Sequence, residues 1–519
     1  MTDETGDISL WIERHAGFFP GRTAVRFQGQ ALSYADLAVG IERAAAVLAG
    51  ELGLRRGERI AWLGLNHPDM LGLLLAAARC GLILVPLNWR LAPPEHAFIL
   101  RNAGAKVLFA QRDLAARLGP DTVPEGCRLV LTDGAQGASL CDLIAAAGPA
   151  PGHEGRADDP LLLVYTSGTT GRPKGAVLSQ KALAINAANA VHMHDMTMRD
   201  HILTVLPMFH VGGLNIQTTP ALKVGAAVTL HDRFDPGTFL AAVAADRPTL
   251  TVLVPATISA LLAHPAWAST DLTSLRAVAT GSMAVPTELI EAIHGRGVPV
   301  IQVYGATETA PVAVYQRIPE AFDSVGCMGR AGLHTEVRVV DASGADVGSG
   351  VPGEVLVRGG HLAGGYWNDP EGTAKAFAGG WFRSGDIAER DAEGRFWFKD
   401  RVKNVIISGG ENIYPAEVER VLRQFKGIRE CQVVGRPDAR WGMVPVAAVV
   451  ADAGAGLTRE AILAHFDGRL ARFKHPHDVV FLAELPRNAM GKVRLDELAR
   501  IMSGGRNAPH ASIITSNPP

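Results

Sequence analysis

The chain has 519 residues, of which 47% are hydrophobic and 20% are charged. It is several times longer than a typical domain, so we expect a large core and more than one domain. Lysine and arginine number 50 and aspartate and glutamate 52, which leaves a net charge of −2. This balance excludes the global positive field that draws proteins to nucleic acid or anionic lipid, so we expect no nucleic-acid partner.

Cysteine usage and the most apolar segment predict a cytoplasmic protein without a transmembrane segment. Five cysteines lie far apart and form no CxxC pair, which predicts reduced thiols rather than a zinc site or a disulfide framework. The first ten residues are acidic, whereas a signal peptide starts with basic residues. The stretch from Met70 to Leu87 is interrupted by Arg79 and Gly81, so we expect a buried helix followed by a buried strand.

Between about residues 58 and 305, short apolar runs alternate with alanine-rich stretches of helical length. This alternation predicts an α/β fold in which helices cover two mostly parallel sheets. From about residue 330 to 400, apolar and polar residues alternate between glycine-rich turns, which predicts a small antiparallel β subdomain. We therefore assign residues 1–400 to one large N-terminal domain.

A second, smaller domain is expected at residues 405–502, after a short join at 401–404. Its pattern predicts helices over Pro415–Phe425 and Arg459–Phe473, with apolar strands between and after them. This is an α+β arrangement of ordinary domain size. Residues 503–519 are polar and small, and we expect them to form a disordered tail.

The segment Tyr165-Thr-Ser-Gly-Thr-Thr-Gly-Arg-Pro-Lys-Gly175 follows a buried apolar strand. Its glycines let the backbone approach a ligand, its hydroxyl groups add donors, and Lys174 adds a positive charge, which together suit a polyphosphate. It is not a Walker A loop, because Pro173 stands where that motif requires glycine and Gly175 where it requires a hydroxyl residue. An ordinary polar loop between a strand and a helix is the alternative.

This loop resembles the phosphate-binding signature of the AMP-forming adenylating superfamily, which includes acyl- and aryl-CoA synthetases, luciferases and the adenylation domains of peptide synthetases. Four further segments match the family in order: Tyr304-Gly-Ala-Thr-Glu-Thr309, Trp381-Phe-Arg-Ser-Gly-Asp386, Asp400-Arg-Val-Lys403 leading into Ile407–Ile413, and Pro486-Arg-Asn-Ala-Met-Gly-Lys492. The resemblance implies that ATP activates a carboxylic acid to an acyl-adenylate with pyrophosphate release. Transfer to coenzyme A (CoA) then gives acyl-CoA and AMP.

The resemblance also implies which residues bind the nucleotide. A carboxylate attacking the α-phosphate of ATP brings two anions together, so positive charge and Mg²⁺ are needed there. Glu308 is the candidate Mg²⁺ ligand, Thr307 contacts the α-phosphate, and Tyr304 stacks on adenine. The full ATP/AMP set is Thr166, Ser167, Gly168, Thr169, Thr170, Gly171, Lys174, Tyr304, Gly305, Thr307, Asp386 and Arg401.

From the residues alone, each of these motifs has an ordinary structural alternative. The 304–309 segment can be a strand end at which Thr307 or Thr309 caps a short helix. Asp386 can be a turn residue that bonds its own backbone, and Arg401 can form a surface ion pair.

Lys492 is the implied catalytic lysine, alongside Lys174, Thr307, Glu308 and His210. By resemblance it bridges the carboxylate and the α-phosphate during adenylation, although an exposed lysine is more often a solubility residue. The same pattern surrounds an acetylated lysine in many such synthetases, so a lysine acetyltransferase acting on Lys492 is a candidate partner. Lys403 matches the family's hinge position, and a plain surface turn is its alternative.

His210 follows an apolar strand and matches the histidine that borders the acyl carboxylate in acyl-CoA synthetases. The implied acyl pocket consists of His210, Val211, Gly212, Gly213, Gly281, Ser282, Val303, Ala306 and Pro311. No acid occurs between Met208 and Asn215, which disfavours amino-acid substrates. No arginine stands at Val303 or Ala306 to pair a second carboxylate, which disfavours dicarboxylates.

Glycines 212, 213 and 281 are expected to leave room for the acid. A medium- or long-chain fatty acid is the preferred substrate. A benzoate- or cinnamate-like acid, or a non-CoA acceptor, is the alternative. A catalytically silent protein on this fold is a further alternative, against which the intact motif residues argue.

The C-terminal half favours CoA as the acceptor. The resemblance implies a CoA site made of Gly409, Gly410, Trp441, Arg90, Phe473, Lys474 and His475. Trp441 has the alternative of an ordinary core or surface aromatic residue. His475 stands where some relatives carry arginine or lysine. The sequence leaves the oligomeric state open, a homodimer included.

Overall fold

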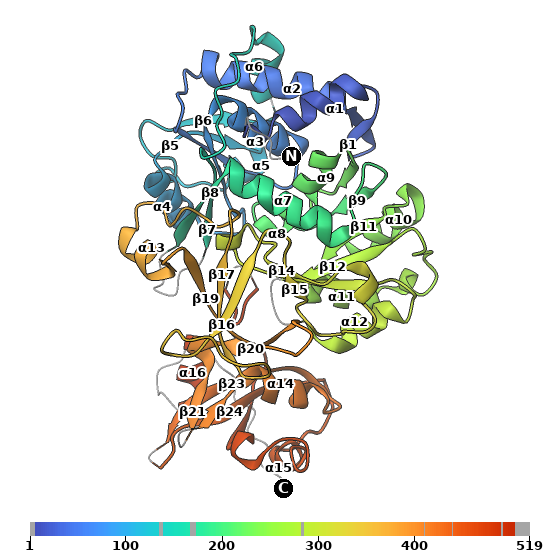
Figure 1. Cartoon of the computed structure of the whole chain (residues 1–519), viewed down its shortest axis with the longest axis vertical. Coiled ribbons are helices and arrows are strands. Elements are labelled where there is room, and N and C mark those ends of the chain that lie inside the picture. The colour runs from blue at the N-terminus through green and yellow to red at the C-terminus, as the bar shows by residue number, and fades with distance from the viewer. Residues whose placement is uncertain are drawn as a thin grey trace. The chain divides into compact units, whose positions relative to one another are not determined.

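The computed structural model describes residues 6–133, 139–166, 173–281, 285–408, 411–438, 440–488 and 491–503, and is drawn in Figure 1. The chain divides into two compact units. Unit 1 contains the chain up to Arg338 together with Leu356–Ser384 and Asp391–Trp397. Unit 2 contains Val339–Val355, Gly385–Arg390 and the chain from Phe398 onward.

Unit 1 contains a six-stranded sheet with the order β6-β5-β3-β4-β7-β8. Neighbouring strands are parallel except for β7 and β8, which pair antiparallel. The strands are β3 Arg59–Leu63, β4 Ile83–Pro86, β5 Ala105–Ala110, β6 Arg128–Leu131, β7 Pro160–Thr166 and β8 Lys174–Ser179.

A nine-stranded sheet in the same unit has the order β15-β14-β13-β12-β11-β9-β10-β1-β2. It is parallel from β13 to β1 and antiparallel at both edges. Its strands are β1 Thr23–Phe27, β2 Gln30–Ser33, β9 His201–Thr204, β10 Ala227–Leu230, β11 Leu250–Leu253, β12 Ala277–Gly281, β13 Val300–Tyr304, β14 Val314–Tyr315 and β15 Arg330–Ala331.

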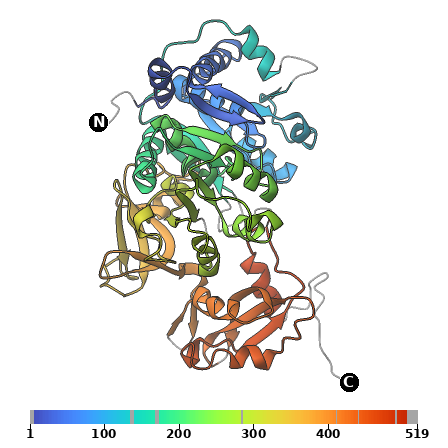
Figure 2. The same cartoon turned by 90° about the vertical axis from the view of Figure 1, so that its right-hand side faces the viewer.

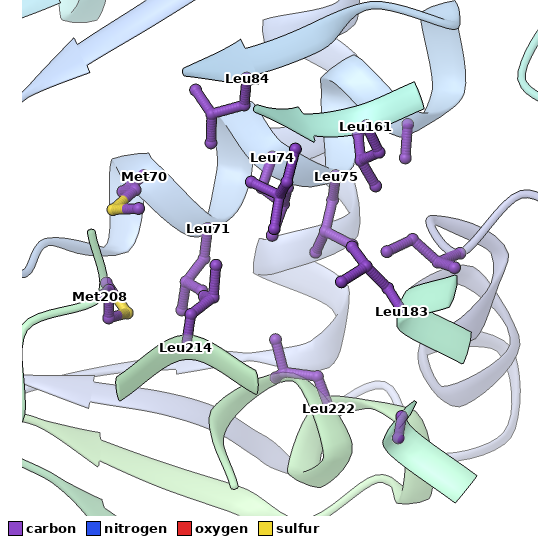
Figure 3. Packing of buried hydrophobic residues seen from close by; sticks show 14 of the residues in the cluster. Met70, Leu71, Leu74, Leu75, Leu84, Leu161, Leu183, Met208, Leu214 and Leu222 are labelled. Carbon is purple, nitrogen blue, oxygen red and sulfur yellow. The ribbon is translucent and has the colours of Figure 1, made fainter. Parts of the chain in front are cut away.

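Helices cover both faces of these sheets, as parallel strands without polar faces require. The largest core cluster joins residues of both sheets with those of α3, α7, α8 and α9, whose leucines meet in Figure 3. Two further clusters pack α10–α12 on the nine-stranded sheet and α4 with α5 on the six-stranded sheet. The helices are α1 Leu10–Phe18, α2 Tyr34–Ala46, α3 Pro68–Cys80, α4 Pro93–Ala103, α5 Arg112–Ala115, α6 Leu140–Ala146, α7 Gln180–His194, α8 Val211–Asn215, α9 Thr218–Val224, α10 Pro236–Asp246, α11 Pro255–Leu262 and α12 Thr287–His294.

The apolar stretch from Met70 to Leu87 forms α3 followed by β4, as the sequence predicts. Pro68 occupies the first turn of α3, where its missing N–H costs nothing, and Gly81 ends the helix with a left-handed φ of 66°. None of the described helices combines the length and the apolar composition that a membrane span requires.

A smaller five-stranded sheet follows, with the order β16-β17-β19-β18 and with β20 beside β19. The division between the two units passes through its strands. The elements are β16 Glu336–Val340, β17 Gly353–Arg358, α13 Pro370–Ala376, β18 Phe377–Ala378, β19 Trp381–Arg390 and β20 Phe396–Arg401.

The C-terminal part of unit 2 is a sheet with the order β22-β21-β24-β23, in which β25 pairs with β24. Figure 2 shows this part from a second side. The elements are β21 Ile406–Ser408, β22 Glu411–Ile413, α14 Pro415–Arg423, β23 Ile428–Asp438, β24 Gly442–Ala451, α15 Arg459–Ala464, β25 Asp478–Phe481 and α16 Leu495–Met502. The predicted fold class, with mostly parallel sheets, antiparallel strands and a C-terminal α+β part, is confirmed.

The predicted helix from Arg459 to Phe473 is too long. The structure has α15 only as far as Ala464 and a separate 3₁₀ turn at Arg472–Lys474. Gly468 adopts a φ of +73° between them, a conformation that a continuing helix cannot contain.

Candidate active site

The 304–309 segment leaves β13 and forms a single 3₁₀ turn at Thr307–Thr309. Thr309 Oγ1 accepts a hydrogen bond from the Ala306 N–H at 2.9 Å, so Thr309 caps the turn. Gly305 leaves no space for a side chain, because a Cβ there would collide with the Pro311 carbonyl oxygen. The structural alternative therefore holds for Thr309, and the cap does not use Thr307 or Glu308.

Glu308 is buried at 9% exposure, yet it accepts a hydrogen bond from the Tyr366 hydroxyl at 2.7 Å. This contact fixes one carboxylate oxygen of Glu308. Burial and the adjacent Glu308 charge raise the pKa of Tyr366, which keeps its hydroxyl protonated and able to donate.

Tyr366 also lies beside Lys174, which belongs to the predicted phosphate loop. The Lys174 ammonium is 5.0 Å from the centroid of the Tyr366 ring and 2.9 Å from Asp369 Oδ2. Backbone hydrogen bonds between β8 and residues 364–367 hold the two segments together. The structure thus groups Lys174, Tyr366, Asp369 and Glu308. The sequence motifs predicted Lys174 and Glu308 but not the other two.

Thr166 ends β7 opposite Lys174. The predicted loop residues Ser167, Gly168, Thr169, Thr170 and Gly171 lie outside the described residues, as does Ser282 of the acyl pocket.

His210 immediately precedes α8, and its ring lies 4.4 Å from that of Phe209. Asn186 on α7 contacts both α8 and the residues that follow the Glu308 turn. Its side-chain amide donates to the Asn215 carbonyl oxygen, at the end of α8, at 2.8 Å, and its Oδ1 accepts from the Val312 N–H at 2.8 Å. The predicted pocket segments around His210 and Pro311 are therefore tied to one helix.

Two glycines of the predicted acyl pocket, Gly213 and Gly281, face neighbouring backbone. A Cβ at Gly213 would collide with the carbonyl oxygens of Leu206 and Pro207, and one at Gly281 with that of Val303. Backbone already fills these positions. Close packing therefore requires glycine at both positions.

Arg90 lies next to this region, with its guanidinium 4.8 Å from the Trp89 ring and 5.9 Å from the Phe209 ring. Burial lowers the pKa of Arg90. Its position over Phe209 places a positive charge beside the residue that precedes His210.

Within unit 2, Asp386 on β19 forms an ion pair with Arg401 at the end of β20, with Arg401 Nε 3.0 Å from Asp386 Oδ1. Desolvation lowers the pKa of Lys492, the like charges of Arg401 and Lys403 lower it further, and Asp386 raises it. Unit 2 therefore brings Lys492 to the predicted ribose pair, although the chain separates them by a whole domain's length.

Known proteins match the chain along almost its whole length. The AMP-binding enzyme family matches residues 12–367, and the AMP-binding enzyme C-terminal domain matches residues 417–492. The chain belongs to the AMP-binding enzyme family. It is 47% identical to the indoleacetate–CoA ligase of Aromatoleum aromaticum, over 96% of this chain and 98% of that one. It is 36% identical to the long-chain-fatty-acid–CoA ligase FadD13 of Mycobacterium tuberculosis, over 89% and 91%.

A solved structure, the anthranilate CoA ligase AuaEII in complex with anthranoyl-AMP, superposes with a TM-score of 0.88 at 26% identity, over 96% of this chain and 98% of that one. This AMP-binding enzyme is thus an acid–thiol ligase that uses ATP to form an acyl-adenylate and then an acyl-CoA.

The donor set around Glu308 fits Mg²⁺ in an AMP-binding enzyme. Among the described residues, no group of three or more histidine, cysteine, aspartate or glutamate side chains could enclose a metal ion. Mg²⁺ is commonly held by one or two carboxylates together with substrate phosphates. A single buried carboxylate such as Glu308 suits that arrangement.

Two of the predicted CoA residues of this AMP-binding enzyme are engaged elsewhere. Lys474 Nζ donates to both Glu417 oxygens at 2.9 and 2.8 Å. His475 Nε2 lies 2.9 Å from the Leu470 carbonyl oxygen, and its ring packs on Phe466. Lys474 is thus paired with a carboxylate on α14, and His475 packs against the buried Phe466.

Trp441 and Phe473, in contrast, are exposed at 41% and 42%. The Arg440 guanidinium lies 4.7 Å from the Trp441 ring. Gly409 and Gly410 lie outside the described residues.

Proposed function

We propose that this enzyme ligates an aryl-substituted carboxylic acid to CoA. The observation that carries the proposal is the 47% identity, over nearly the full length, to a ligase for indoleacetate, an aryl acid. The relative named for long-chain fatty acids is 36% identical over a smaller share of both chains. The fatty acid preferred from sequence becomes the second candidate.

In this proposal the residues of unit 1 prepare the α-phosphate for attack. Glu308, oriented by Tyr366, holds Mg²⁺, which when bound supplies positive charge to the phosphates. Lys174 exchanges its ion pair with Asp369 for the phosphates of ATP, because one ammonium can satisfy either anion. Thr309 caps the turn, so the Thr307 hydroxyl is not used for capping and donates to the α-phosphate.

Unit 2 supplies residues for the ribose, for the adenylation step and for CoA. Asp386 accepts the ribose hydroxyls while its ion pair with Arg401 orients the carboxylate. Lys492 places its ammonium between the acid's carboxylate and the α-phosphate, where charge develops as the new P–O bond forms. Trp441 and Phe473 contact CoA through their exposed rings.

A panel of acids tests the substrate class. The enzyme is assayed with ATP, Mg²⁺ and CoA on indole-3-acetate, phenylacetate, 4-hydroxycinnamate, octanoate and palmitate, and AMP and thioester are quantified by chromatography. We expect kcat/KM for the best aryl acid to exceed that for either fatty acid by about tenfold or more. A higher value for octanoate or palmitate would overturn the proposal, and AMP formation without thioester would point to another acceptor.

A further inference from the structure

Gln217 lies between α8 and α9 and is buried at 1% exposure. It occupies the N-cap position of α9, but its side chain makes no capping hydrogen bond. The side chain is instead turned into the protein, so its burial serves a role other than capping the helix.

The hydrogen bonds of the Gln217 amide fix its orientation. Its Nε2 donates to His194 Nε2 at 3.0 Å and to the Thr251 carbonyl oxygen at 3.3 Å. His194 is able to accept because its Nδ1 donates to the Ala190 carbonyl oxygen, and because burial lowers its pKa to about 4, which keeps the ring neutral. A flipped amide would place Gln217 Oε1 against two acceptors.

Gln217 Oε1 is thereby held as an acceptor without a donor. Within the described part of the chain, no group donates a hydrogen bond to this buried oxygen. The residue lines a cavity of about 10 Å³, together with Thr204, Leu206, Gly213, Thr218 and Val252. Such a volume admits one water-sized group, for example a hydroxyl or the N–H edge of a ring.

The neighbouring threonines do not supply the missing donor. Thr218 Oγ1 is 2.8 Å from the Gly213 carbonyl oxygen, to which it donates, and is also 2.8 Å from Thr204 Oγ1. Thr218's proton is used on Gly213, so Thr204 is the donor in the pair. Both hydroxyl protons are therefore committed.

The strand register places this cavity on the same face of the sheet as two residues of the candidate acyl pocket. Val252 on β11 pairs with Ala279 on β12, which pairs with Ile301 on β13. Gly281 and Val303, two predicted pocket residues, stand two positions further along the same strands and so on the same face of the sheet. Gly213 and Leu206 flank His210 in sequence and line the cavity directly.

We propose that Gln217 Oε1 is a specificity determinant that accepts a hydrogen bond from a ring N–H or hydroxyl on the aryl group of the acid. This inference rests on the proposed function. A fixed, buried acceptor favours a partner that donates and penalises an isostere that cannot, because the oxygen then stays unpaired. A hydrocarbon tail would leave it unpaired in the same way.

The experiment compares two substrates of the same shape on the intact enzyme. Indole-3-acetate carries a ring N–H, and benzofuran-3-acetate carries an ether oxygen in its place. We expect wild-type kcat/KM to favour the indole by about tenfold or more. In Gln217→Met this ratio should fall to near one, with the benzofuran rate retained.

Thr219→Val is the matched control. Thr219 is buried two residues after Gln217 and does not line the cavity. Its hydroxyl forms hydrogen bonds with the Leu214 carbonyl oxygen and with Asn215 Oδ1. This variant should keep the wild-type ratio even if it loses stability.

Three outcomes overturn the inference. The first is a wild-type indole-to-benzofuran ratio of kcat/KM near one, which needs no variant. The second is a Gln217→Met enzyme that keeps the wild-type ratio. In either case turnover of both ring acids leaves the aryl-acid proposal intact. If neither ring acid is a substrate while fatty acids are, the proposed function fails and this inference fails with it.

Discussion

Desolvation and the nearby charges of Arg401 and Lys403 lower the pKa of Lys492 and Asp386 raises it, although the side chain is exposed. An isolated lysine gains nothing from such a position. A lysine that neutralises a developing negative charge does, because the anion of the transition state offsets the repulsion.

Replacing Lys492 with alanine should therefore lower acyl-adenylate formation by about a hundredfold or more. Thioester formation from a supplied acyl-adenylate should stay close to wild type, because that step forms no bond at the α-phosphorus. Pyrophosphate release and single-turnover thioester assays measure the two steps. Equal losses in both would argue that Lys492 is not specific to adenylation.

At the residue scale, the motifs predicted the groups that carry local signatures, such as Lys174 and Glu308. Tyr366 could not be predicted as the partner of Glu308, because it lies 58 residues away and enters the site only through pairing with β8. Lys474 and His475 show the opposite case. The resemblance implied CoA contacts for both, which stay a prediction, but no motif indicated that Lys474 would pair with Glu417 or that His475 would contact the Leu470 carbonyl oxygen.

The elements of unit 1 depend on close approach between parallel strands, and Gly281 on β12 is a sensitive position. A side chain there would collide with the Val303 carbonyl oxygen on β13. Gly281→Ala should reduce the free energy of unfolding by about 1–3 kcal/mol, because β12 and β13 must separate. Urea unfolding followed by circular dichroism measures the change.

Gly72 provides the control within α3. Nothing lies within 4 Å of a Cβ at this position. Gly72→Ala should raise the free energy of unfolding by about 0.5–1 kcal/mol, since alanine loses less backbone entropy in a helix. A neutral Gly281→Ala variant would show that the strands relax at no cost.

At the element scale, continuous apolar runs predicted the buried parallel strands, because short runs of this kind, separated by segments of helical length, are typical of parallel sheets covered on both faces. The limits of α15 were predicted less well. Its sequence continues the helical periodicity past Ala464, whereas the helix has already ended there and Gly468 adopts a positive φ before the 3₁₀ turn at Arg472–Lys474.

For the whole molecule, the two matched family regions leave residues 368–416 between them, and Lys403 lies in that interval. The structure forms a single 3₁₀ turn there, Val402–Asn404. Asp400 anchors its start by accepting hydrogen bonds from Arg401 N, Asn404 Nδ2 and Ala416 N at 2.7, 3.0 and 2.8 Å. We propose this turn as the hinge about which the C-terminal domain rotates between half-reactions.

Lys403→Pro tests the hinge by fixing φ at residue 403. We expect thioester formation to slow roughly tenfold while adenylation changes little, because only one step requires the rotated state. Single-turnover measurements separate the two. Lys403→Ala removes the charge without fixing φ and should leave both rates near wild type. Equal slowing of both steps by proline would place the hinge elsewhere.

The two-part organisation was predictable from the change of sequence texture near residue 400. The boundary in the structure was not, because the division between the units passes through strands of the small sheet that come from separate parts of the chain. Pairing between strands that are far apart in sequence cannot be predicted from local composition.

The central claim is that the acid is activated by attack of its carboxylate on the α-phosphorus of ATP. Oxygen-18 in the carboxylate tests it directly, because the attacking oxygen stays on phosphorus when the CoA thiol later displaces AMP. With doubly labelled indole-3-acetate, ATP and CoA, mass spectrometry of the products should find one labelled oxygen in AMP and the other in the thioester carbonyl. Unlabelled AMP, or ADP as the nucleotide product, would contradict the claim.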